Sequence, residues 1–225
     1  PVISLFPQSE TDEIISSISF SKPEISKDVP VTDSEIFAEY IRSEMEGLFS
    51  ETTISVTDSD KENQSLAFQK SNSTAENISL ASARYTAFTN VDKVADNYLL
   101  RLRIIDDQNG TDKSSCQENF TAEQLTDLSK FKYVIGTVSS KALNQLHIQL
   151  TQYQINCMIG KADENEITSD NLQEIINLTE NQINDIDSKI SSLKNQTGSS
   201  SDDNKKKILQ LQSQKQKLVL KEQSD

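Results

Sequence analysis

The stretch YLLRLRIIDDQNG, residues 98–110, decides the fold. In its first eight residues, the apolar side chains at even positions alternate with Arg101 and Arg103. Successive side chains of a strand point to opposite faces, so this alternation predicts a strand with one face in the core and one in solvent. The Asn-Gly pair that ends the stretch readily adopts the positive φ of a tight turn. The stretch therefore predicts one strand of an antiparallel sheet and the turn that follows it.

Segments on either side of this stretch predict its partners in the sheet. Residues 84–89 alternate in the same way and reach it through a turn at 92–97, while residues 112–117 follow the Asn-Gly turn. Three strands in this order form an antiparallel meander. Upstream, the alternating residues 53–57 and the short apolar run at 2–6 predict two further strands.

Two capping boxes predict the helices that cover this sheet. Thr32 and Glu35 have the spacing in which each side chain meets the other's free backbone N–H group, so a helix is expected to begin near Thr32. Thr121 and Gln124 repeat this spacing and predict one long helix that ends at Leu146. The apolar face of the first helix consists of Ile36, Phe37, Tyr40, Ile41, Met45 and Leu48.

Other segments have less regular patterns. Gly136 lies in the middle of the long helix, where glycine costs about 1 kcal/mol relative to alanine, so we expect another segment to pack closely against it. From His147 to Ile159 the apolar residues nearly alternate, which predicts a strand after the helix. Residues 8–31 mix polar residues with isolated hydrophobics and predict an irregular or partly extended insertion.

Beyond Gly160 the apolar residues recur at steps of three and four, which is the heptad pattern of packed helices. A TGSSS sequence at 197–201 interrupts the pattern, and a second helix with the same spacing follows it. We therefore predict an α/β (α+β) fold: a domain at 1–160 with a mixed sheet packed with helices, then an antiparallel helical hairpin or short coiled coil at 161–225.

The hairpin is the feature of the sequence that predicts an interaction. Lys215 on the seam leaves the two helices a marginal pair, so docking onto a partner protein or a second copy of the chain is expected. The alternative is that the seam covers only itself and the α/β domain. The candidate partner-binding residues are Ile183, Ile186, Ile190, Leu193, Ile208, Leu211 and Leu218.

Charge and composition limit the partners. The chain has 35 acidic and 22 basic residues, a net charge of −13, so a polyanion would be repelled and no nucleic-acid partner is expected. No apolar run approaches the roughly 20 residues that span a bilayer. The chain opens at Pro1 without a methionine, so we expect a trimmed sequence in which membrane contact occurs only through a removed lipid anchor.

The residues that support catalysis or metal binding are sparse. His147 is the one histidine, so a zinc site lacks ligands, and no glycine-rich phosphate loop occurs. Asp106 and Asp107 belong to the turn pattern. We expect no enzyme, no cofactor and no metal. Cys116 and Cys157 either form a disulfide or remain two thiols, and the sequence leaves both open.

A family resemblance follows from the hairpin. The strand at 84–89, its turn, the run at 98–106 and the Asn-Gly turn are similar to the hairpin of a bacterial envelope family. Its members include the curli-secretion lipoprotein CsgG, the N-terminal domain of TolB and the penicillin-binding-protein activator LpoB. The elements over residues 1–146 follow the family's order, although the family's glycines before the hairpin are absent. The resemblance implies an α/β sandwich in a periplasmic lipoprotein with a non-catalytic, partner-binding role.

These observations predict a non-enzymatic envelope lipoprotein, periplasmic or anchored to the outer membrane. It is expected to bind another envelope protein as a scaffold or as an activator of periplasmic machinery. The alternative is a surface-exposed adhesin or a secreted effector. The two differ in whether the precursor has a lipobox cysteine shortly before Pro1 and whether whole cells expose the protein to protease.

Overall fold

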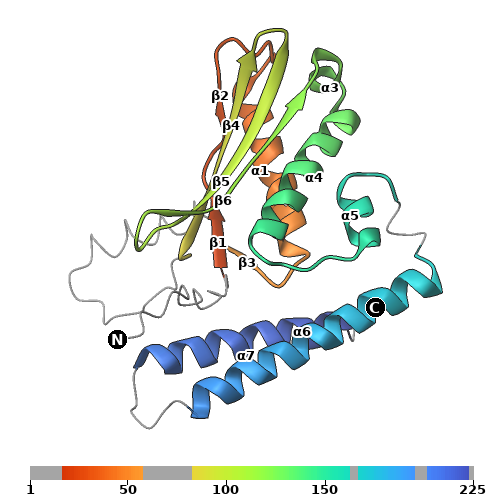
Figure 1. Ribbon diagram of the computed structural model, residues 1–225. Helices are drawn as coiled ribbons and strands as arrows, with labels where there is room; N and C mark the ends of the chain where they lie inside the picture. The colour runs from red at the N-terminus through yellow and green to blue at the C-terminus, as the bar shows by residue number, and fades with distance from the viewer. Residues whose placement is uncertain (1–16, 58–82, 163–166, 196–201, 223–225) are drawn as a thin grey trace, which may run out of the picture.

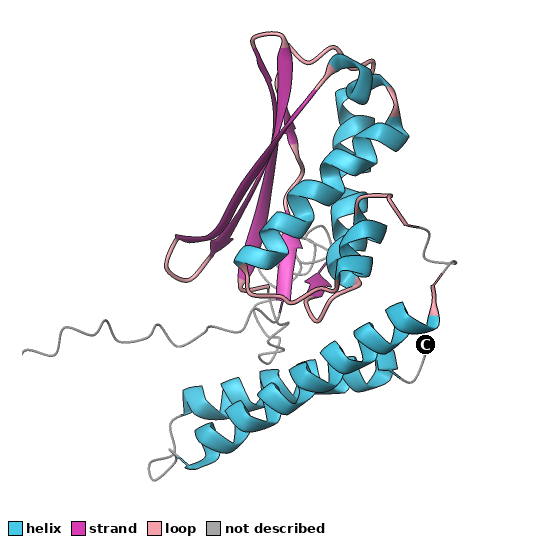
Figure 2. Cartoon of the chain, turned by 45° about the vertical axis from the view of Figure 1, so that its right-hand side comes forward, coloured by secondary structure: helices cyan, strands magenta, loops and turns pink. Residues whose placement is uncertain are grey.

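The computed structural model describes residues 17–57, 83–162, 167–195 and 202–222. They form an α+β fold in which a six-stranded mixed sheet carries helices on one face (Figures 1 and 2). Two long helices, α6 (Ser169–Asn195) and α7 (Asp202–Glu222), follow as an antiparallel pair. The predicted fold class is confirmed.

The sheet combines parallel and antiparallel pairing. Its strands are β1 (Ser17–Phe20), β2 (Glu24–Ile25), β3 (Ser55–Thr57), β4 (Tyr85–Val94), β5 (Asn97–Asp106) and β6 (Thr111–Phe120). The order is β3-β1-β4-β5-β6, with β2 also paired to β4. β1 is parallel to β3 and β4, whereas β4, β5 and β6 are antiparallel. The predicted meander is confirmed, with each of its strands longer than expected.

The two turns of the meander each hold one residue at positive φ. Gly110 has a φ of 68°, and its N–H donates to the Asp106 carbonyl at 2.7 Å. The β4–β5 turn places Ala95 at a φ of 54°, a conformation that costs a residue with a Cβ some strain.

The segment at 8–31, predicted as an irregular or partly extended insertion, is partly extended over its described residues and belongs to the sheet. β1 and β2 both lie there; Ile18 and Phe20 of β1 are fully buried, and Ser19 between them is buried as well. Four residues are too few to establish a period in the sequence, and the parallel pairing of β1 with β3 and β4 is a long-range contact. The predicted strand at 2–6 lies outside the described residues.

Helix α1 (Ser34–Ser50) begins one residue later than predicted. Its cap is Asp33, whose carboxylate accepts from the N–H groups of Glu35 and Ile36 at 2.9 and 3.1 Å, so Thr32 is not the cap. The predicted apolar face is correct except at Ile36, which is 70% exposed.

The predicted long helix is divided. The capping box of Thr121 and Gln124 is present, but it opens the short α3 (Ala122–Thr126). Asp127 then caps a separate helix, α4 (Leu128–Gln145). An aspartate side chain meets two free N–H groups at a helix start, which favours a new cap over an unbroken helix.

The predicted strand from His147 is wrong, because α5 (Gln152–Met158) occupies that region. A third capping box, Thr151 with Gln154, starts this helix. The expected close packing at Gly136 is confirmed: a Cβ there would lie 2.0 Å from the Met158 carbonyl oxygen. The backbone of α5 therefore crosses α4 where only glycine leaves room.

The apolar core consists of two clusters. The larger lies between the sheet and helices α1 and α4, where the rings of Phe37, Phe131, Phe120 and Tyr98 follow one another at centroid distances of 5.0 to 5.5 Å. The smaller joins α6 to α7 and shares no residue with the first.

Candidate protein-binding surfaces

The candidate partner-binding residues of the hairpin pack against one another. Ile186, Ile190, Leu211 and Leu218 are 1 to 8% exposed, and the other three predicted residues pack against them. The structure thus brings together the complete predicted set as the core of the helix pair. A partner would meet the hairpin first on other faces, and the binding role of the set stays a prediction.

An ion pair accompanies this seam. Lys215 Nζ lies 2.8 and 2.6 Å from the two carboxylate oxygens of Asp187, with both side chains partly exposed. It connects α7 to α6 where the sequence predicted a lysine on the seam. The positive charge of Lys215 is therefore paired with a carboxylate of the other helix.

A cleft of about 100 Å³ separates the hairpin from the α/β part. Its walls come from the segments that precede β3 and α5, from the first half of α6 and from Leu218 of α7. Gln182 Nε2 donates across the boundary to the Gln149 carbonyl at 3.1 Å. Ile175 and Leu178 form a second apolar row on α6, beside the row that meets α7. Glu51 is the one ionisable side chain of the lining, so this cleft offers apolar contact and amide hydrogen bonds.

An exposed apolar surface lies where α1 and α4 begin side by side. We call Ile36, Tyr40 and Leu128 the α1–α4 patch. Ile36 is 70% and Leu128 53% exposed, and the Tyr40 hydroxyl donates to the Leu128 carbonyl at 3.4 Å. Ile36 and Tyr40 are four residues apart on one helix face. Burial and the nearby Glu44 carboxylate raise the pKa of Tyr40, so its hydroxyl stays a donor at neutral pH.

The patch rests on a rigid base. Beneath it, Phe37 of α1 and Phe131 of α4 pack with their ring centroids 5.0 Å apart. One turn further along, Lys132 Nζ lies 3.4 Å from Glu44 Oε2 and connects the same two helices. The ring contact and the ion pair fix the spacing of Ile36 and Leu128.

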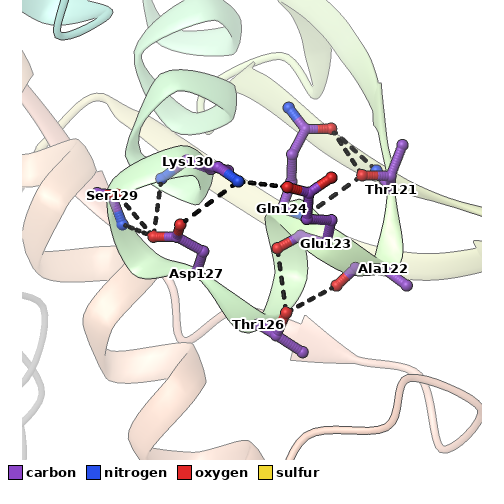
Figure 3. Close-up of polar contacts among 8 residues, drawn as sticks. All are labelled: Thr121, Ala122, Glu123, Gln124, Thr126, Asp127, Ser129 and Lys130. Atoms are coloured by element: carbon purple, nitrogen blue, oxygen red, sulfur yellow. Dashed lines mark hydrogen bonds and ion pairs between the residues drawn. The ribbon is translucent and has the colours of Figure 1, made fainter.

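Polar contacts connect α3 to the first turn of α4 (Figure 3). The Asp127 carboxylate accepts from the Ser129 hydroxyl at 2.6 Å and from the Ser129 N–H at 3.1 Å. The hydroxyl hydrogen bond is the main cause of a lowered pKa of Asp127. Lys130 contacts Glu123 of α3, which raises the pKa of Lys130 and connects the two helices. Leu128 is thereby held in the first turn of α4.

The buried acidic group of the β5–β6 turn has a structural role. Asp106 is fully buried and pairs with Arg84 Nη2 at 2.8 Å. Burial alone would raise the pKa of Asp106, but the hydrogen bonds from Arg84 and from the Gln108 N–H lower it below its ordinary value. The Asn109 amide donates to the same carboxylate at 3.3 Å. This carboxylate organises the turn, as its sequence pattern predicted.

The remaining reactive side chains lie apart. His147 is exposed just beyond the end of α4, the helix-end position expected from the sequence. Cys116 is buried on β6, and it does not form a disulfide with Cys157 of α5. Over the described ranges, no three His, Cys, Asp or Glu side chains gather in a way that could hold a metal ion. None of the described helices has the length and apolar character needed to cross a bilayer.

The sequence pattern missed the α1–α4 patch, because Ile36 and Leu128 both fit the apolar period of a buried face. Asp127, directly before Leu128, was a signal for a second helix start, and the first turn of a helix frequently faces solvent. The parallel packing that brings the two helix starts together involves residues some ninety positions apart, and no local pattern reports it.

Comparison with known proteins gives distant structural neighbours only. No family model and no curated protein matches the chain. A lipoprotein of Neisseria meningitidis, GNA1162, is 14% identical over 60% of this chain and 99% of its own, with a TM-score of 0.32. The hypothetical protein CT253 of Chlamydia trachomatis is 12% identical over 65% and 94%, with a TM-score of 0.28. Likeness at this level carries no inference about function, so the family resemblance stays a prediction.

Proposed function

We propose that the protein is a non-enzymatic protein of the bacterial envelope, tethered by a lipid, that holds another protein as a scaffold or activator. The observation that carries the binding role is the α1–α4 patch. Single exposed hydrophobics are ordinary on a protein surface. Here Ile36 of α1 and Leu128 of α4 are both more than half exposed, and Tyr40 of α1 contacts the backbone of Leu128. Aromatic and aliphatic anchors on a rigid base are typical of protein interfaces.

The geometry of the patch favours a folded partner. Both helix starts are fixed by side-chain caps, Asp33 on α1 and Asp127 on α4, so binding would cost little conformational entropy. Two exposed acidic residues, Asp33 and Glu35, lie at the same helix start as Ile36, and Glu35 pairs with Lys22 at 3.1 Å. A partner with an apolar knob and a basic group opposite Asp33 would complement this surface.

The hairpin supplies a second element of the proposal. The predicted seam residues hold α6 and α7 together, and the second apolar row of α6 faces the α/β part across the cleft. In this proposal the seam residues affect binding indirectly, because they hold α6 and α7 together.

The envelope location rests on the sequence resemblance alone. The described chain runs β1, β2, α1, β3, β4, β5, β6, α3 and α4, and the first strand that the resemblance implied, at residues 2–6, lies outside the described residues. Metabolic labelling of the natural protein with a radioactive fatty acid tests the lipid anchor. Label in an envelope fraction is expected, whereas an unlabelled protein in the medium would favour the secreted alternative.

The binding role is tested by site-specific photocrosslinking in cells. A photoreactive residue at position 36 is expected to capture one envelope protein, and the same residue at position 209 serves as the control. Leu209 is 65% exposed on α7, so it matches Ile36 in exposure but lies outside the patch.

Substitutions at the patch sharpen this test. Ile36→Gln combined with Leu128→Gln removes the apolar surface at two helix starts, where polar side chains are well tolerated. A photoreactive residue at position 40 is used to capture the partner in the double variant. If the partner is no longer captured while the midpoint of thermal unfolding is unchanged, the proposal is supported. Equal capture from positions 40 and 209, or capture that survives the double substitution, would contradict it.

A further inference from the structure

We propose that the C-terminal hairpin is a movable arm, which closes on the α/β part through the first half of α6 and opens with its own fold intact. This inference does not depend on the α1–α4 patch. The hairpin lies across one end of the α/β part (Figures 1 and 2). Its side of the cleft comes from residues 172–182 of α6 and from Leu218 of α7, and the described residues of α6 beyond 182 do not line it. A small contact therefore carries a long arm.

Each of the two parts has its own apolar core. The cluster that closes the seam of the hairpin shares no residue with the core under the sheet. The ion pair between Asp187 and Lys215 also joins α6 to α7 within the arm. Opening therefore leaves both cores intact. Relative motion of two such parts is the ordinary expectation unless the interface between them is large and hydrophobic.

The contact between the two parts is loosely packed. On α6, Leu172, Ile175 and Leu178 line the cleft and are only half-buried. Further along the same helix, Ile186 and Ile190 are almost completely buried at the seam. About 100 Å³ of unfilled space remains between the walls of the cleft. Close-packed interiors leave few voids larger than a water molecule, so this contact lacks the packing of a fixed interface.

The chemistry of the walls favours a closed arm over two parts that stay separate. Ile148 and Leu150 form the opposite wall, and both pack against the core of the α/β part. A neutral hydrogen bond from Gln182 Nε2 to the Gln149 carbonyl, 3.1 Å long, crosses the cleft. Apolar rows associate in water, and one neutral hydrogen bond adds little to that association. Closing thus covers an apolar row on each part through a contact that is weaker than either core.

Pulsed electron paramagnetic resonance of the full chain measures the distance between the two parts. Spin labels are placed at Gln117→Cys on β6 and at Ser192→Cys on α6, which are both exposed sites. A Cys157→Ser background leaves Cys116, which is buried, as the only other thiol. Two distances are expected, one for the closed arm and one for the open arm.

A substitution in the cleft should shift the balance between the two distances. Leu178→Asp should raise the ratio of open to closed arm at least about tenfold, because a carboxylate is costly to bury against apolar walls. Asn181→Asp adds the same charge at an exposed site of the same helix, so it should leave the ratio unchanged. A single distance common to the labelled chain and both variants, or an equal shift in both variants, would overturn the proposal.

Thiol reactivity tests the opening without a charged substitution. In the same Cys157→Ser background, Ile175→Cys places a thiol in the cleft, and Ser188→Cys places one on the exposed surface of α6. A maleimide on a polymer too large for the cleft should label position 175 at least about tenfold more slowly than position 188, but faster than the chain unfolds. Equal rates at the two positions would mean that the arm does not close. Labelling of position 175 no faster than global unfolding would mean that it does not open, and either result would refute the movable arm.

Discussion

The α/β part and the C-terminal hairpin bury their apolar residues to different depths. Between the sheet and its helices, large side chains such as Phe131 and Leu102 are completely excluded from solvent. In the hairpin, Ile186 and Ile190 keep 8% and 7% of their surface exposed. A sheet with helices encloses a side chain from several directions, whereas two helices share a single seam. The hairpin therefore owes its stability to fewer contacts, and the following predictions test this difference.

The largest effect on stability is expected from truncating one buried side chain in each of the two apolar cores. Phe131→Ala should lower the free energy of unfolding by about 4 kcal/mol, because a fully buried ring leaves a cavity. Ile190→Ala should cost about 2 kcal/mol, because the seam can collapse and water can enter. Urea unfolding followed by circular dichroism measures both. Equal losses would mean that the hairpin core is as closed as the main core.

The next effect concerns the crossing of α4 and α5. Gly136→Ala should destabilise the protein by about 3 kcal/mol, since the new Cβ would meet the backbone carbonyl of Met158 at 2.0 Å. Gly47→Ala in α1 is the matched control: a Cβ there meets nothing within 4 Å, so helix propensity should stabilise it by about 1 kcal/mol. The midpoint temperature of thermal unfolding should fall for Gly136→Ala and rise for Gly47→Ala. A neutral Gly136→Ala would refute the close crossing.

A smaller effect is expected at the buried turn carboxylate. Asp106→Asn should cost about 2 kcal/mol at neutral pH, because it leaves the guanidinium of Arg84 without its anion. The pKa of Asp106 is lowered in the folded state, so this stabilisation is present above the ordinary aspartate pKa and is lost as the pH falls through the folded value. The free energies of unfolding of the unaltered protein and of Asp106→Asn are measured at a series of acidic pH values, and their difference should become smaller as the pH falls. A pH-independent difference would contradict the assigned ion pair.

The smallest effect is expected at the seam of the hairpin. Lys215→Met removes the ion pair with Asp187, in which both partners are more than a third exposed, and should change stability by about 0.5 kcal/mol or less. Methionine keeps the apolar stem of the lysine over the seam. A change above about 2 kcal/mol would show that the ion pair, and not the apolar seam, holds the two helices together.

Local patterns were sufficient for the central hairpin and for the helix pair. Alternation at residues 98–105 and the Asn-Gly turn predicted β5 and the turn to β6, because both depend on neighbouring residues. The heptad spacing predicted which side chains of α6 and α7 meet. β1 and α5 were missed, since a four-residue strand and a seven-residue helix are too short for periodicity to establish.

The sequence by itself determined the meander, the start of α3 through its side-chain cap, and the need for a glycine at 136. These follow from backbone geometry and from hydrogen bonds within a few residues. Only the tertiary structure decided which apolar residues stay exposed. Ile36 and Leu128 satisfy the same helical period as buried neighbours, and the parallel packing of α1 and α4 leaves them at the surface. Exposure depends on contacts between segments distant in the chain, and a local period cannot encode them.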